Sequence, residues 1–175
     1  KLQFRQSQEA LRFIADETTA NREQRDAQRE GNLLHDILSN VRTANDLGKA
    51  CAMQVQKGHC NSQEAANFQK ILTEKLASVS SYAWFNKDWQ VINERSIFAP
   101  EVHNLTKIVR PDRIIIKANC ATVIDYKFYN EVKDVETNRK QVAAYMNILQ
   151  NIGYQDVEGY LWYVNQDKVI NVSER

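Results

Sequence analysis

The stretch IVRPDRIIIKANCATVIDYKF, residues 108–128, carries the strongest fold signal in the chain. It holds two apolar runs rich in β-branched residues, 114–116 and 122–124, with a short polar segment between them. β-Branched residues pack well on a pleated surface, and a short polar segment between two such runs is typical of a hairpin turn. The stretch therefore predicts two paired, buried strands over residues 109–116 and 122–128.

Three charged side chains lie at the ends of these two strands. Side chains alternate across a strand, so Asp125 and Lys127 project from the same face, and Asp112 opens the neighbouring strand. Two carboxylates can hold a hard divalent cation that binds a phosphate oxygen and acidifies a water molecule. An ammonium group beside them can orient that water. The arrangement predicts a metal-dependent phosphodiesterase that uses Asp112, Asp125 and Lys127.

The Asp-x-Lys pattern is short, and a second instance of it occurs nearby. Asp/Glu-x-Lys is expected roughly once by chance in a chain of this composition. Asp125 follows an apolar run, whereas Glu131, in Glu131-Val132-Lys133, lies in a polar segment. From spacing alone, the alternative for the first instance is a pair of strand-end carboxylates with an exposed lysine.

The rest of the chain predicts a helical first part and a mixed second part. Four helices are expected first, over residues 6–14, 20–41, 44–56 and 62–79, the last opening with a capping box of Asn61 and Glu64. The elements expected next are strands 90–98, 109–116 and 122–128, helix 135–150, and strands 157–164 and 168–172, with a loop over 100–107. This order predicts one α/β domain, with residues 1–80 mainly helical and residues 88–175 forming a β-β-β-α-β core. The sheet is expected to be mixed and flanked by helices.

Five separated motifs share their order with a known family. They are Gly31-x-x-x-His35, Glu94, Arg110-Pro111-Asp112-Arg113, Ile124-Asp125-Tyr126-Lys127 and Gln141-x-x-x-Tyr145. Together they resemble the PD-(D/E)XK nuclease domain of the RecB/AddA type, found at the C-terminal end of bacterial recombination helicase-nucleases. The likeness spans about residues 7–172, and five motifs in the right order are far more specific than any one of them.

The resemblance implies a restriction-endonuclease-like fold and a divalent-metal-dependent DNA exonuclease that acts in double-strand-break repair and recombination. It implies the metal ligands His35, Asp112, Asp125 and the main-chain carbonyl of Tyr126, the catalytic lysine Lys127, and the site residues Gln141 and Tyr145 near the DNA. The metal is expected to be Mg²⁺. A histidine ligand leaves Mn²⁺ open, because imidazole favours softer ions than magnesium.

The outlying motif residues also have plainer interpretations. His35 lies on the flank of an apolar helix stripe, where a partly buried, hydrogen-bonded histidine is the alternative to a metal ligand. Gln141 and Tyr145 are one helical turn apart, and their alternative is a solvated glutamine and a half-buried tyrosine. Glu94 can support the site from the preceding strand, or it can be an edge-strand charge that faces solvent.

Composition is that of an ordinary globular enzyme domain, with 43% hydrophobic and 26% charged residues. The chain has no apolar stretch long enough to span a membrane and no secretory signal. Three scattered cysteines, Cys51, Cys60 and Cys120, predict free thiols in a reducing compartment. The resemblance implies that this compartment is the bacterial cytoplasm. Some relatives carry an iron–sulfur cluster on four cysteines. Because this chain has only three cysteines, no such cluster is expected here.

A net charge of +1 gives no bulk signal for nucleic acid, so a DNA-binding face must come from local clusters of basic residues. The candidates are Arg22, Arg25, Arg29, Arg42, Lys107, Arg110, Arg113, Lys133, Arg139 and Lys140, of which Arg110, Arg113, Arg139 and Lys140 are included among the site residues. The mixed charges of residues 21–26 favour a solvated helix instead.

The chain lacks a Gly-x-x-x-x-Gly-Lys-Ser/Thr phosphate loop, so no ATP site is expected in it. It begins at Lys1, which favours a nuclease domain cut from a longer protein. The expected partners are DNA, the helicase domain of that parent protein and a second subunit. Two other classes stay open: a non-catalytic DNA-end-binding or docking module, and a nuclease-fold subunit that acts as a protein-interaction scaffold.

Overall fold

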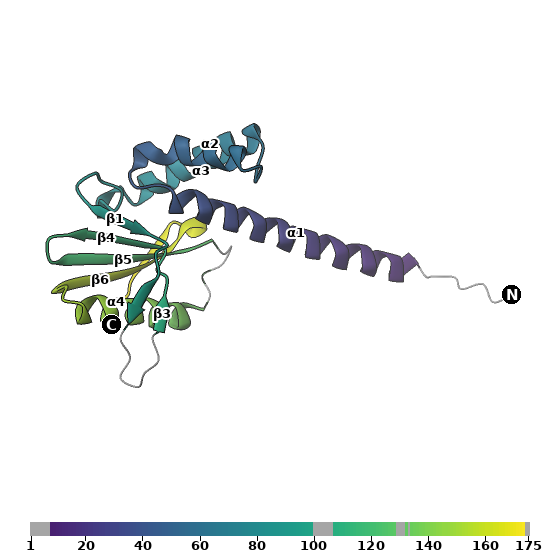
Figure 1. Cartoon of the computed structure of the whole chain (residues 1–175). Helices are drawn as coiled ribbons and strands as arrows, with labels where there is room; N and C mark the ends of the chain where they lie inside the picture. The colour runs from purple at the N-terminus through teal and green to yellow at the C-terminus, as the bar shows by residue number, and fades with distance from the viewer. Residues whose placement is uncertain (1–7, 100–106, 129–131, 133, 174–175) are drawn as a thin grey trace.

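A five-stranded sheet forms the centre of the computed structural model, which describes residues 8–99, 107–128, 132 and 134–173 (Figure 1). The strand order is β1-β4-β5-β6-β7. The strands are β1 (Gln90–Asn93), β4 (Arg113–Lys117), β5 (Cys120–Lys127), β6 (Asp156–Tyr163) and β7 (Lys168–Asn171). Only β5 and β6 run parallel within this sheet, and the other neighbours are antiparallel. The mixed α/β class predicted from the sequence is confirmed.

The predicted hairpin is the pair β4–β5. Lys117 pairs with Cys120, which leaves a two-residue turn in which Ala118 has a φ of 53°. A positive φ of this kind matches the twist that two-residue hairpins need. From Ala121 to Tyr126 every side chain of β5 is buried, because the sheet is covered on both faces.

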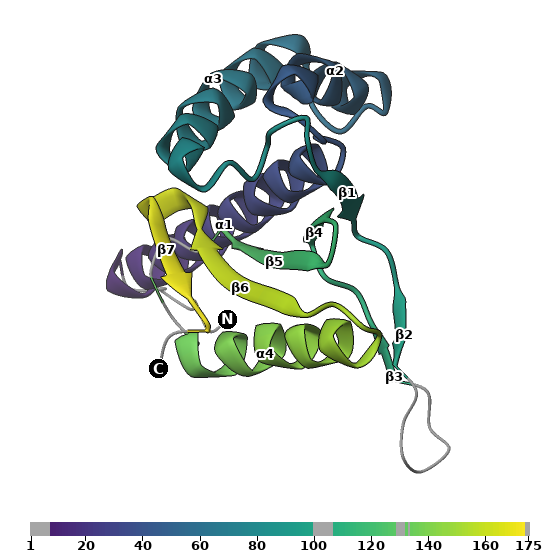
Figure 2. The same cartoon turned by 90° about the vertical axis from the view of Figure 1, so that its left-hand side faces the viewer.

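Helices cover the two faces of the sheet unequally (Figure 2). One face packs on α1 (Gln8–Ser39), α2 (Leu47–Gln56) and α3 (Ser62–Ser78), with Ile124, Tyr126 and Trp162 as its sheet contribution. The other face packs on α4 (Val135–Asn151), which supplies the crossover between parallel β5 and β6. Because side chains alternate, Asp125 and Lys127 project toward the α4 face.

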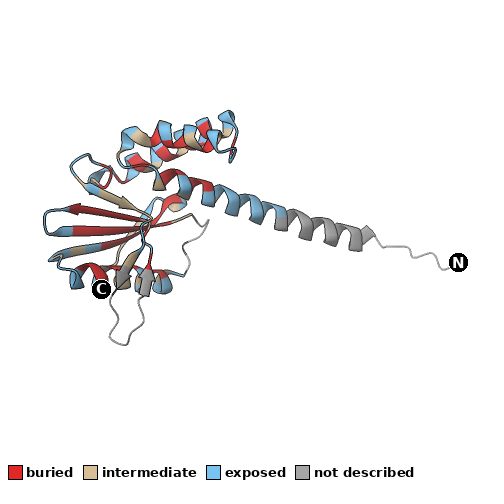
Figure 3. Ribbon diagram, in the orientation of Figure 1, coloured by how far each residue is buried: buried red, intermediate tan, exposed pale blue. Residues whose placement is uncertain are grey.

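The N-terminal helix differs from the prediction of two helices over 6–14 and 20–41. α1 is continuous from Gln8 to Ser39, and its first half extends away from the body of the protein (Figure 1). Residues 15–19 contain no glycine or proline, and poor helix formers such as threonine cost only a few tenths of a kcal/mol each. Residues 22–30 are all exposed, as predicted for a solvated helix (Figure 3). Residues 6 and 7 lie outside the described residues.

The other helical predictions are largely confirmed. Segment 44–56 forms a short 3-10 turn, Ala44–Asp46, followed by α2. The capping box before α3 is present: Glu64 N–H donates to Asn61 Oδ1 at 2.9 Å, and Asn61 N–H donates to Glu64 Oε2 at 2.8 Å. The three cysteines are free thiols, as expected. Among the described residues, no helix has the length and apolar character required to cross a membrane.

Two predicted strands are each broken near the point where the site residues lie. Segment 90–98 divides into β1 and β2 (Ile97–Ala99), and segment 109–116 divides into β3 (Lys107–Val109) and β4. β2 and β3 form a separate two-stranded sheet, which Figure 2 shows beside the end of α4. Glu94 has a φ of 48°, and Pro111 lacks the N–H that a continuous ladder requires. Residues 100–106 of the predicted loop lie outside the described residues.

These breaks place two carboxylates in adjacent turns rather than inside strands. Asn93 pairs with Arg113 at the last position of the β1–β4 ladder. Beyond it, the Glu94 N–H donates to the Asp112 main-chain oxygen at 3.0 Å. Glu94 and Asp112 therefore both lie just beyond the same end of the β1–β4 ladder.

Candidate active site

The predicted site residues from β5 form an ion pair at the end of that strand. Lys127 Nζ lies 2.5 Å from Asp125 Oδ2. Asp125 is buried, and only 13% of the Lys127 side chain is exposed. The two side chains share a face because they are two residues apart in an extended segment, as the alternation predicts.

Burial and, second, the nearby carboxylate of Asp112 raise the pKa of Asp125 to about 6, although Lys127 and His35 act in the opposite direction. A buried carboxylate loses hydration that its one ammonium partner does not fully replace. The ionised form of Asp125 is thus disfavoured in the fold, and an additional positive charge nearby would stabilise it.

His35 lies between two carboxylates. Its Nε2 is 2.9 Å from Asp112 Oδ1, and its Nδ1 is 2.9 Å from Glu94 Oε1. The pKa of His35 is raised, chiefly because of the hydrogen bond to Asp112, although partial burial acts against it. The imidazole of His35, from α1, therefore contacts both turns at the end of the sheet, the one with Glu94 and the one with Asp112.

Asp112 also contacts β5. Its second oxygen, Oδ2, accepts a hydrogen bond from the main-chain N–H of Tyr126 at 2.8 Å. Tyr126 stands between Asp125 and Lys127, and its buried ring contacts the His35 ring edge-on at 6.2 Å between centroids. Asp112 therefore links the histidine of α1 to the strand that carries Asp125 and Lys127.

Glu94 turns toward His35 rather than toward solvent, and Arg110 holds it there. Arg110 Nη2 lies 2.5 Å from Glu94 Oε2, and Arg110 Nε donates to the Glu94 main-chain oxygen at 2.8 Å. Arg110 itself is exposed, with 62% of its side chain accessible. The guanidinium thus contacts both the side chain and the strained turn backbone of Glu94.

Gln141 and Tyr145 contact each other on α4. Gln141 Nε2 donates to the Tyr145 hydroxyl at 2.7 Å, with Gln141 exposed and Tyr145 buried. Burial raises the pKa of Tyr145, and the charges of Asp125 and Asp112 raise it too. The Tyr145 hydroxyl is thus close enough to Asp125 and Asp112 for their charges to act on it.

The four residues predicted to contact DNA differ in how far they are exposed. Arg110 and Lys140 are exposed and Arg139 is partly buried. The prediction for Arg113 is wrong, because its side chain is fully buried and donates to main-chain oxygens of residues 41, 42 and 84. A run of arginines around a motif does not distinguish an exposed guanidinium from one that binds carbonyl groups inside the fold.

Sequence reasoning also missed a polar residue on the same helix face as Gln141. Asn138 is buried, and its Nδ2 lies 3.2 Å from the hydroxyl of Tyr163, which pairs with Lys127 in the parallel β5–β6 ladder. The signal in the sequence was an asparagine one helical turn before Gln141, on the same helix face. A polar side chain there is expected to find a hydrogen-bond partner if it is buried.

The donor atoms present suit a divalent cation. Among the described residues, His35, Glu94 and Asp112 each offer a ligand atom within 4.8 Å of the other two. Asp125 is close enough for its charge to interact with Asp112 and His35. Carboxylate oxygens with one imidazole are ligands that fit Mg²⁺ or Mn²⁺. The residues therefore fit such an ion on the chemistry of their donors.

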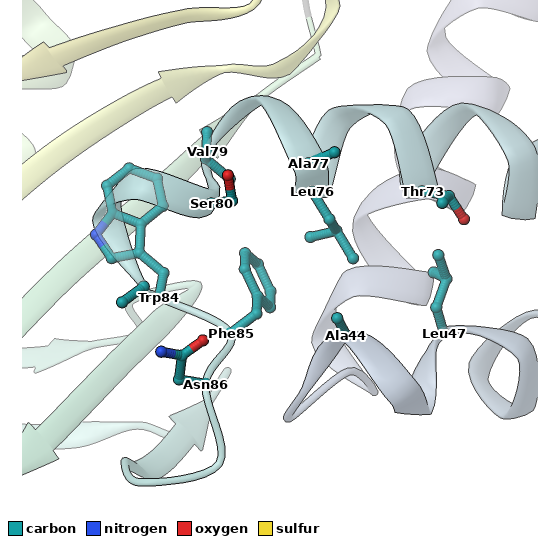
Figure 4. Close-up of a pocket in the computed structure, with 11 residues that line it drawn as sticks. Ala44, Leu47, Thr73, Leu76, Ala77, Val79, Ser80, Trp84, Phe85 and Asn86 are labelled. Atoms are coloured by element: carbon teal, nitrogen blue, oxygen red, sulfur yellow. The ribbon is translucent and has the colours of Figure 1, made fainter.

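A separate apolar hollow of about 280 Å³ lies in the helical layer, between the 3-10 turn Ala44–Asp46, α3 and the segment that follows α3 (Figure 4). Its lining residues are Ala44, Leu47, Thr73, Leu76, Ala77, Val79, Ser80, Ala83, Trp84, Phe85 and Asn86. None of the predicted site residues lines it, so it is distinct from the cluster at the sheet end.

This cluster of acidic residues, a histidine and a lysine at the end of a mixed sheet defines a nuclease-type domain. Residues 4–174 match the family model of the PD-(D/E)XK nuclease superfamily, and the chain belongs to that superfamily. The restriction-endonuclease-like fold predicted from the sequence is confirmed. Members are generally metal-dependent nucleases, which implies DNA as the substrate. No curated protein matches the chain.

Proposed function

We propose that the protein is a divalent-metal-dependent deoxyribonuclease. The observation that carries the proposal is the Asp125–Lys127 ion pair at 2.5 Å beside the hydrogen-bonded pair His35–Asp112. The proposed metal ligands are His35, Asp112, Asp125 and the main-chain carbonyl of Tyr126. Mg²⁺ is the proposed ion, with Mn²⁺ as a substitute.

The bound ion supplies a Lewis acid that polarises the phosphate and acidifies a water molecule. Lys127 orients the attacking water and donates a hydrogen bond to the phosphate, a role that needs the ammonium held in place by Asp125. Burial of Asp125 and Lys127 excludes bulk water from that contact and strengthens the charges. In this proposal the reaction is the hydrolysis of one phosphodiester bond.

Glu94 and α4 supply the surrounding contacts. Glu94 accepts from His35 Nδ1, which fixes the imidazole with Nε2 beside Asp112, where it would serve as a ligand. Gln141 donates to a phosphate oxygen or to a metal-bound water, and the Tyr145 hydroxyl orients its amide. Arg110 and Lys140, both exposed, are proposed to contact the DNA backbone.

The test is cleavage of DNA by the purified protein. End-labelled linear DNA and closed circular DNA are incubated with Mg²⁺, with Mn²⁺ or with a chelator. We expect cleavage with either ion, none with the chelator, and none with Lys127→Ala. Lys117→Ala is the matched control, because Lys117 is an exposed lysine in the adjacent strand β4. DNA binding without cleavage under every condition would favour a non-catalytic end-binding domain instead.

We further propose the RecB/AddA type: an exonuclease domain, residues 1–175, that a helicase motor feeds during double-strand-break repair in the bacterial cytoplasm. The support is the order of the five motifs from Gly31 to Tyr145. The partners in this proposal are the helicase domain of a parent protein and a second subunit, and the products carry a 5′-phosphate and a 3′-hydroxyl. Cleavage of linear but not closed circular DNA is the expected result, and rapid loss of the circle would contradict it.

A further inference from the structure

Arg113 is the largest charged side chain that the described fold buries completely. Its Nη1 donates to the main-chain oxygen of Val41 at 2.7 Å, and its Nη2 donates to the oxygens of Arg42 at 2.7 Å and Trp84 at 2.9 Å. Its Cζ lies 4.2 Å from the centre of the Phe85 ring. A buried guanidinium is stable only when its donors are used in this way.

Two of these acceptors, the oxygens of Val41 and Arg42, lie two and three residues beyond Ser39, the last residue of α1. The last carbonyls of a helix have no partner inside the helix, and a cation near them also interacts favourably with the helix dipole. Asn93, which pairs with Arg113 in the sheet, donates to the oxygens of Ser39 at 2.9 Å and Val41 at 3.1 Å. Arg113 and Asn93 thus bind the end of α1 to the β1–β4 pair.

The same arginine is adjacent to the candidate metal site. It directly follows Asp112 in the chain, and its guanidinium lies beside the buried hydroxyl of Tyr126. His35 is one helical turn before the end of α1, at Ser39. The distance between His35 and Asp112 therefore depends on how the end of α1 is fixed to the β1–β4 pair, and the hydrogen bonds of Arg113 are part of that attachment.

We propose that Arg113 is a positioning residue for the metal site: it fixes the end of α1 so that His35 Nε2 meets Asp112. The metal-binding part of this inference rests on the proposed function, whereas the position of His35 can be measured without metal. Trp84 and Phe85, which contact Arg113, also line the apolar hollow shown in Figure 4. That hollow belongs to the supporting layer rather than to the substrate path.

The test compares Arg113→Lys with Asn93→Ala, a milder change to the same attachment. Lysine keeps the charge but cannot span three carbonyls from two segments. Imidazole NMR signals are recorded for the metal-free protein, with the His35 signals assigned by their loss in His35→Ala. We expect the His35 signals to shift or broaden in both variants while those of His59, which bonds Gln54 at 2.8 Å, stay unchanged.

Mn²⁺ affinity is then measured by calorimetry at a temperature where each variant is folded. We expect binding to weaken about 10-fold or more in Arg113→Lys, the range found when outer-shell support of a metal ligand is lost. His35→Ala should weaken binding strongly in the wild-type background and less than about twofold in the Arg113→Lys background. The control is Leu72→Ala, a buried truncation in α3 that lowers stability without removing a hydrogen bond to the end of α1.

Unchanged His35 signals in a folded Arg113→Lys protein would overturn the proposal, and so would an effect of His35→Ala that is equal in both backgrounds. If Leu72→Ala moved the His35 signals as much, Arg113 would be only a general stabiliser. If the wild-type protein bound no Mn²⁺, the proposed function would fail, and the NMR comparison would still decide the role of Arg113.

Discussion

His35 and Asp112 lie far apart in the sequence, yet the histidine Nε2 and the aspartate Oδ1 are 2.9 Å apart. One residue comes from a helix on one face of the sheet, and the other comes from a turn at the sheet end. Asp125 and Lys127 project toward the opposite face. The candidate site is therefore assembled around the end of the sheet, so each of its parts can be tested separately.

The buried carboxylate of Asp125 predicts a gain in stability when its charge is removed. Its pKa is raised to about 6, so the folded protein holds this proton more tightly than the unfolded chain does. Stability of the metal-free protein should fall as the pH rises from about 4 to about 6. Asp125→Asn should then be more stable than wild type at pH 7 by about 3 kcal/mol.

The measurement is chemical unfolding in the presence of a chelator at pH 7 and at pH 4. At pH 4 the carboxyl group is protonated in the folded state, so the two proteins should differ little. Asp125→Asn should also lose metal binding and cleavage. A variant that is less stable than wild type at both pH values would show that the carboxylate is stabilising in the metal-free fold.

Removal of the lysine predicts a loss of catalysis without a loss of binding. Lys127→Ala should lower the cleavage rate at least about 1,000-fold while DNA affinity changes less than about threefold, because the ammonium acts mainly in the transition state. Single-turnover cleavage and fluorescence anisotropy measure the two quantities. Cleavage at the wild-type rate, or a parallel fall in affinity, would remove Lys127 from its proposed role.

The contact between Glu94 and His35 predicts a graded effect on metal binding. Glu94→Ala should weaken Mn²⁺ binding about 10–100-fold, because the imidazole loses the group that orients it. Glu94→Gln should have a smaller effect, because the amide oxygen still accepts from Nδ1. Calorimetric titration of both variants makes the comparison. Equal losses in the two would mean that the negative charge of Glu94, rather than its hydrogen bond, is required.

The Gln141–Tyr145 hydrogen bond predicts a moderate role in positioning. Gln141→Ala and Tyr145→Phe should each lower cleavage, though less than loss of Lys127, since the metal ligands are untouched. Tyr145→Phe keeps the buried ring, so its thermal stability should change by about 1 kcal/mol or less. Cleavage and melting temperature are measured side by side. Lower stability with unchanged cleavage in both variants would assign the pair to the scaffold.

Local patterns in the sequence were sufficient for the sheet, the hairpin and the shared face of Asp125 and Lys127, because alternation along a strand is a local property. The burial of Arg113 was not predictable in this way, since its partners Val41 and Trp84 are distant in the sequence. The sequence also did not predict that the two strands are broken at Glu94 and Pro111. Apolar residues continue on both sides of each break, so the hydrophobic pattern shows no interruption.

The two breaks separate the β1–β4 pair from the two-stranded sheet of β2 and β3. The hydrogen bond from Glu94 N–H to the Asp112 oxygen closes the β1–β4 ladder before β2 and β3 begin their own pairing. The hydrogen bond that joins the turns of Glu94 and Asp112 thus belongs to the five-stranded sheet, and the two carboxylates keep that link without any contribution from the β2–β3 pairing.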